Sequence, residues 1–351
     1  MISMSNLQFG LAIAGGVVLG IMVVHTVWTS RKNGPRQPTP QDPADEPVTE
    51  PHRGSGIEPG MDVEAFDVTN FPLPAFEKKP SMDALIDVIA PITLEAPVSG
   101  DLALAALPAT RRVGSKPFAI EGFSEAHQRW EIPVAGQRYS QFQAGVQLAN
   151  RSGALNEIEY SEFVMKTQAF CDAINGTPDF PEMREEVARG RELDHFAGDH
   201  DAQLGFVVRA RNASWSPGYV QQIAARLGFV AGAIPGRMVL PASQAGMPPV
   251  LGLTFDTQAA LADDPALSAI RELALSLDVA QVERSERAFV RMREAAQSLA
   301  QAMDGAVTDS NDIALPPEAL DQIGIELEQL YDTLDQRELS AGSALARRLF
   351  S

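Results

Sequence analysis

The longest uninterrupted apolar stretch of the chain is Leu7–Trp28, which contains no Asp, Glu, Lys or Arg. As an α-helix this stretch would be about 33 Å long, at ~1.5 Å per residue, enough to cross a hydrocarbon layer of about 30 Å. Arg31, Lys32 and Arg36 follow it, and no charged side chain precedes it. Because positive charge is retained on the cytoplasmic side, we expect residues 1–32 to be a single-pass anchor with the N-terminus outside and the rest in the cytoplasm. A cleaved signal peptide is the alternative, but it would carry its basic residues before a shorter apolar run.

A region poor in apolar residues follows the anchor, over residues 33–80. It holds ten prolines, nine acidic and four basic residues. Such a composition cannot bury enough apolar surface to fold, so it predicts a disordered, extended linker. The end of the linker, residues 66–80, differs because Phe66, Phe71, Leu73 and Phe76 recur between prolines. We expect this end either to pack on the domain that follows or to form a short linear motif for another protein.

From Met82 onward, short alternating stretches are interleaved with stretches of helical periodicity. Residues 81–196 begin with a strand, a turn and a short helix, and continue with alternating strands and two helical stretches. The pattern restarts over residues 197–351, where Ser216 and Pro217 open a helix after the first strand. Residues 82–107 and 200–227 both read as strand, turn and helix. The sequence therefore predicts an α+β fold of split β-α-β units with antiparallel sheets, and the repeated strand, turn and helix suggest that one unit is duplicated.

The charge and the few reactive side chains restrict the possible functions. A net charge of −18 and a pI near 4.7 argue against nucleic-acid binding, which needs clustered Lys and Arg. Cys171 is the single cysteine, so an intrachain disulfide is impossible, and its apolar surroundings predict a buried thiol. Residues 194–201 contain two histidines and three aspartates, but on a predicted loop these are more typical of caps and turns than of a metal site. No catalytic motif is present, so we expect no cofactor, no metal and no enzymatic activity.

Three stretches of the second half resemble one known family. They are Leu227–Gly232, with the sequence LGFVAG, Gly246–Asp256, with the sequence GMPPVLGLTFD, and Phe289–Gly305, followed by Ala-Val-Thr-Asp. Together with the anchor and the Pro-rich acidic linker, they resemble the ZipA family of bacterial division proteins. The resemblance implies a non-enzymatic adaptor at the division site of the inner membrane, whose cytoplasmic domain binds the C-terminal tail of FtsZ. A membrane-anchored scaffold for another division or envelope protein and a membrane enzyme are the alternatives. Residues 82–196 have no clear counterpart in the family.

In that family one face of the sheet stays uncovered and binds the tail peptide in a shallow apolar groove. Alternation here directs Leu273, Leu275 and Leu277 towards the helices, and therefore Ala274 and Ser276 to the opposite face. Ser276 matches a position where the family has a groove aromatic, and Asp256 matches one with a groove methionine. The resemblance and the alternation together predict the following tail-binding surface: Val207, Arg209, Ala233, Ile234, Met238, Thr254, Asp256, Ala274 and Ser276.

Overall fold

A computed structural model describes residues 82–262 and 268–351. The predicted anchor, residues 1–32, and the predicted linker, residues 33–80, lie outside the described residues. Across the described part of the chain, no helix combines the length and the apolar character that a membrane span requires. The described residues form two compact units. Residues 82–149 and 154–191 make up the N-terminal unit, and residues 150–153 and 192–351 make up the C-terminal unit.

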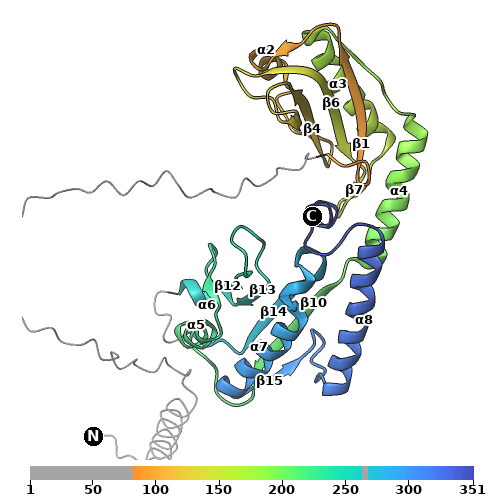
Figure 1. The fold of residues 1–351 in the computed structure, drawn as a ribbon. Coiled ribbons are helices and arrows are strands. Elements are labelled where there is room, and N and C mark those ends of the chain that lie inside the picture. Colours follow the sequence, from red (N-terminus) through yellow and green to blue (C-terminus); the bar gives the residue numbers. More distant parts are fainter. Residues whose placement is uncertain (1–81, 263–267) are drawn as a thin grey trace, which may run out of the picture. The chain divides into compact units, whose positions relative to one another are not determined.

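The N-terminal unit is an antiparallel sheet with two helices (Figure 1). Its elements are β1 (Asp87–Leu94), β2 (Val98–Ser99), α2 (Gly100–Ala106), β3 (Arg112–Val113), β4 (Lys116–Ser124), β5 (Arg129–Glu131), β6 (Arg138–Gln147), α3 (Glu157–Ile174) and β9 (Gly176–Pro178). The strand order is β3-β4-β6-β1-β9, with β2 also paired to β6 and β5 also paired to β4. The short strands β7 (Ala149–Asn150) and β8 (Gly153–Ala154) and the helix α4 (Met183–His200) contain the points where the chain passes from one unit to the other.

Aromatic side chains form the core between this sheet and α3. Phe118 of β4 meets Phe163 of α3 edge to face, with ring centroids 6.0 Å apart, and Phe142 of β6 meets Phe170 at 5.3 Å. Each such pair contributes about 1 kcal/mol beyond the burial of its area. Asn156 caps the start of α3. Its side chain accepts hydrogen bonds from amides of the first turn, and the Glu159 carboxylate accepts one from the Asn156 amide.

The C-terminal unit contains a six-stranded antiparallel sheet, in the order β11-β12-β13-β14-β10-β15. Its elements after α4 are β10 (Gln203–Ala210), α5 (Pro217–Arg226), β11 (Val230–Ala231), β12 (Arg237–Leu240), β13 (Leu251–Phe255), α6 (Thr257–Leu261), β14 (Glu272–Asp278), the 3₁₀ turns η2 (Val279–Gln281) and η3 (Arg284–Glu286), α7 (Ala288–Met303), β15 (Gly305–Thr308), α8 (Pro317–Gln336) and α9 (Ala344–Leu349). As predicted, Ser216 caps α5 and Pro217 takes its first position.

Both units have the same connectivity. In the C-terminal unit, β14 and β15 are joined through α7 and both pair antiparallel with β10, which lies between them. In the N-terminal unit, β6 and β9 are joined through α3 and both pair antiparallel with β1, which again lies between them. Each is a split β-α-β unit. The predicted α+β class with antiparallel sheets is confirmed, and residues 82–107 and 200–227 each form a strand followed by a helix.

One helix holds the core of the C-terminal sheet in place. Phe289 of α7 contacts Phe206 of β10 edge to face at 6.2 Å. Trp215 is fully buried and donates its ring N–H to the carbonyl oxygen of Met303 at 2.8 Å, which satisfies one of the free carbonyls at the end of α7. These contacts lock α7 against the strands β10, β14 and β15. The opposite side of those strands is therefore the one available to a ligand.

Candidate functional site

The strands of the C-terminal sheet separate their side chains cleanly between two faces. On the face turned to α7, Phe206, Leu275 and Leu253 are neighbours across three strands and are at most 3% exposed. The alternate positions form the other face, which we call the outward face. Its central row runs across five strands and consists of Gly205, Ser276, Gly252, Val239 and Val230.

The centre of the outward face is built from very small side chains. Gly205 and Ser276 are exposed, and Gly252, Thr254 and Ala274 are partly exposed. Gly252 and Ser276 are so close that a Cβ on Gly252 would lie 2.6 Å from the Ser276 hydroxyl. The backbone of the sheet is therefore within reach of an approaching chain at this point. Val230 and Val239 close the row on one side with apolar surface.

Five of the predicted surface residues lie on the outward face. Thr254, Ala274 and Val207 are direct cross-strand neighbours in one row, next to the row that contains Ser276. Arg209 pairs with Glu272 in a third row. Alternation placed these residues correctly because β10, β13 and β14 are regular strands over the relevant positions.

Three predicted residues do not lie at outward positions of a strand, and a fourth lies just beyond the end of its strand. Met238 is 4% exposed and lies opposite Leu253, so it faces the helices, and Val239 occupies the outward position instead. Ala233 and Ile234 belong to the turn between β11 and β12, not to a strand. The reason is that β11 ends at Ala231 and the chain reverses through Gly236, whose φ of +78° suits glycine.

Asp256 is the fourth of these residues. It follows the last residue of β13 and caps α6, accepting a hydrogen bond from the amide of Gln258 at 2.8 Å. Its carboxylate is therefore engaged at a helix start, which is a favourable place for a negative charge. The sequence contains the signal for this role, since an Asp directly before a short apolar helical stretch is a typical N-cap.

Arginine side chains stand at two edges of the outward face. Arg209 forms ion pairs with Glu272 at 2.6 Å and with Asp312 at 2.5 Å, so its charge is already balanced. Arg237, the cross-strand neighbour of Thr254, is exposed and has no carboxylate partner among the residues that the structure describes. An acidic group of a bound peptide would find its counter-charge at Arg237.

The His and Asp cluster, apart from Asp201, lies on α4 and not on the predicted loop. His195 pairs with Asp199 at 2.9 Å, one helical turn apart on α4. His200 stacks on the ring of Phe196 at 4.3 Å and contacts its carbonyl oxygen through Nδ1 at 2.7 Å. Over residues 82–262 and 268–351, no group of His, Cys, Asp and Glu has the arrangement of a metal site.

Comparisons with known proteins identify no relative. No family model matches the chain, and no curated protein matches it. Among solved structures, "Structure of FgChi7B" has a TM-score of 0.21 and 10% identity, covering 74% of this chain and 56% of that one. Berberine bridge enzyme from Eschscholzia californica has a TM-score of 0.16 and 9% identity, covering 75% of this chain and 54% of the enzyme. The chain thus spans little more than half the length of each. Both TM-scores are too low to indicate a shared fold.

Proposed function

We propose that this protein is a non-enzymatic, membrane-anchored adaptor of bacterial cell division. Residues 1–32 hold it in the inner membrane through Leu7–Trp28, the linker extends into the cytoplasm, and the C-terminal unit binds the C-terminal tail of FtsZ. The observation that carries this proposal is the outward face of the sheet. It lies on a split β-α-β unit of the kind that the sequence resemblance implies, and its centre is small and open to solvent.

An extended peptide fits such a face for physical reasons. Small side chains at Ser276, Ala274 and Gly252 let the peptide approach the sheet closely, so that its apolar side chains can be buried against Val230 and Val239. Burial stabilises the complex by about 25 cal/mol for each Å² of apolar surface removed from water. Arg237 provides a counter-charge at the edge.

A single contact of this kind is weak, and the membrane anchor compensates for that. Many adaptor molecules in one membrane would meet many tails along one FtsZ polymer. Once a first tail is bound, the next binding events take place at a high effective concentration, which raises the overall affinity without any new contact. The adaptor would in this way hold the division ring at the membrane.

A different peptide partner is the second candidate, and one observation favours it. Ser276, at the centre of the outward face, is polar, whereas the resemblance implies an aromatic side chain at that position. A scaffold for another division or envelope protein would use the same face with a more polar ligand.

Co-pelleting of the full-length chain with FtsZ polymers tests the proposal. The protein is placed in lipid nanodiscs and mixed with polymers of intact FtsZ or of FtsZ that lacks its C-terminal tail. We expect the nanodiscs to pellet with intact polymers and to stay in the supernatant with tailless polymers. Equal pelleting in the two cases, or none in either, contradicts the proposed partner, and in that event the second candidate becomes the better one.

A further inference from the structure

The edge strand β4 of the N-terminal unit has a gap in its pairing. On the side away from β6, β3 pairs with Lys116 and Pro117, and β5 pairs with residues 122–124. Between these two stretches, no strand of the described chain lies beside residues 119–121. Phe118 donates its amide to the carbonyl of Arg111 at 3.0 Å, so its backbone groups point away from β6. Because these directions alternate in an antiparallel pair, the N–H and C=O of Ile120 also point into the gap.

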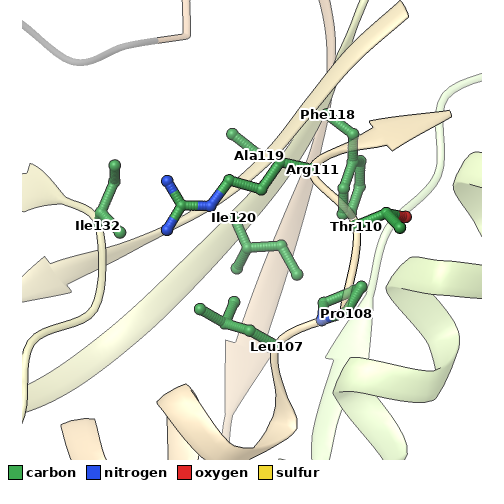
Figure 2. A pocket seen from close by; sticks show the side chains of 8 residues that line it. All are labelled: Leu107, Pro108, Thr110, Arg111, Phe118, Ala119, Ile120 and Ile132. Carbon is green, nitrogen blue, oxygen red and sulfur yellow. The ribbon is translucent and has the colours of Figure 1, made fainter.

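An apolar pocket lies at this gap (Figure 2). Its volume is about 50 Å³, several times the ~10–15 Å³ that one water molecule needs on this measure. The walls include Leu107, Pro108, Ile120 and Ile132. Figure 2 shows the side chain of Arg111 crossing the pocket with its guanidinium directed towards Ile132. The site thus combines an open peptide group, room for one apolar side chain and a cation.

These three features are what an added β-strand requires. Main-chain hydrogen bonds to an open sheet edge hold such a segment, and a pocket selects one of its side chains. We propose that residues 66–80 of the same chain, FDVTNFPLPAFEKKP, bind at the gap in β4 as a short additional strand.

The point where the described chain begins supports this occupant. Met82 is 7% exposed and packs over the sheet at Gly145, where an added Cβ would lie 2.5 Å from the methionine sulfur. Gly145 is the cross-strand partner of Ala119, and Ala119 lines the pocket. Since neighbouring strands are ~4.8 Å apart, the Met82 side chain lies over the sheet within roughly 10 Å of the gap. Extended chain at ~3.3 Å per residue gives Phe76 a reach of about 20 Å from Met82.

The composition of the segment also matches the site. It offers apolar side chains for a pocket of this size, and Glu77 lies next to Phe76, where it can pair with Arg111. Pro72 and Pro74 have no backbone N–H, and proline is tolerated only at sheet edges. Leu73 between them keeps its N–H, which suits an edge where a single peptide group is open. Binding at the gap would leave residues 33–65 as the free part of the linker.

Hydrogen exchange at the Ile120 amide, measured on the full-length chain in nanodiscs without any partner, tests the inference. Two variants should weaken this binding. The segment variant carries both Leu73→Glu and Phe76→Glu, and the pocket variant carries Ile132→Glu. Val134→Glu is the matched control for Ile132→Glu. Both residues are exposed in the same loop, Val134 at 53% and Ile132 at 38%, but Val134 does not line the pocket. An intramolecular segment acts at an effective concentration near millimolar, so even a contact with a Kd of ~0.1 mM slows exchange about tenfold. We expect that protection in the parent and in Val134→Glu, and its loss in the other two variants.

Two results would overturn the inference. One is an Ile120 amide that exchanges equally fast in the parent and in the segment variant. The other is protection of this amide that falls when the protein is diluted, because binding within one chain does not depend on concentration. Such a result would assign the gap to a second copy of the chain. If Ile132→Glu lowers the melting temperature, the segment variant decides alone, since its substitutions lie outside the described fold. No FtsZ is present, so failure here leaves the proposed function untouched.

Discussion

A single carboxylate at the centre of the outward face should abolish most tail binding without harming the fold. Ser276 is exposed, and its cross-strand neighbours on the two sides, Gly205 and Gly252, have no side chains. The substitution Ser276→Glu therefore has space on the free protein and leaves the core untouched. In the complex, however, the new carboxylate would stand beneath the bound peptide. Ala274→Glu, one row away on the same strand, places a charge under the same peptide.

The size of the effect can be estimated in two ways. If the peptide stays in place, the carboxylate loses water without gaining a partner, which costs at least 1 to 3 kcal/mol. If the peptide moves aside, withdrawal of about 60 Å² of apolar contact costs about 1.5 kcal/mol at 25 cal/mol per Å². The first route weakens binding about fivefold or more and the second about tenfold, since 1.4 kcal/mol corresponds to a factor of ten. Stability should change by no more than about 0.5 kcal/mol, as for other surface substitutions, or roughly 1–2 °C in melting temperature.

Titration of the full-length chain in nanodiscs with a fluorescent FtsZ-tail peptide measures the effect. Ser276→Gln serves as the uncharged match for Ser276→Glu and separates size from charge. Gln297→Glu adds the same charge on α7 at an exposed position and should bind like the parent. If Ser276→Glu and Ala274→Glu both bind the peptide with the parent's Kd while the melting temperature is unchanged, the outward face is not the binding site.

Two further predictions concern the C-terminal core and the single cysteine. Trp215→Phe leaves the buried carbonyl of Met303 without its donor and should lower the free energy of unfolding by about 2 kcal/mol in urea titrations. Tyr219→Phe removes an exposed hydrogen bond to Ala302 from the same helix end, at 3.0 Å, and should cost well under 1 kcal/mol; equal losses would contradict this reasoning. Burial, followed by the nearby charge of Asp172, raises the pKa of the Cys171 thiol to about 11. At pH 8 the thiol therefore stays protonated and should resist alkylation until the chain is unfolded, and rapid labelling of the folded protein would refute its burial.

The sequence by itself determined where some helices begin and which side of a regular strand is buried. Leu273, Leu275 and Leu277 repeat every second residue, so the direction of Ala274 and Ser276 followed without any structure. Likewise, Ser216 and Pro217 located the start of α5, because a cap depends only on groups within the next turn. The antiparallel α+β class also followed, since it depends on the order of short strands and helices along the chain.

Only the tertiary structure decided the features that depend on pairing between distant segments. Met238 faces the helices because β12 is held in register by β13, with Met238 opposite Leu253. A shift of one residue in a register reverses every side chain of a strand, and the sequence around Gly232 does not specify where the strand begins. The gap in β4 is likewise invisible in the sequence, because it exists only where β3 stops pairing and β5 starts. Helix caps and strand alternation depend on residues that are close in sequence. A sheet edge and its pocket are instead formed by strands that meet only in the folded chain.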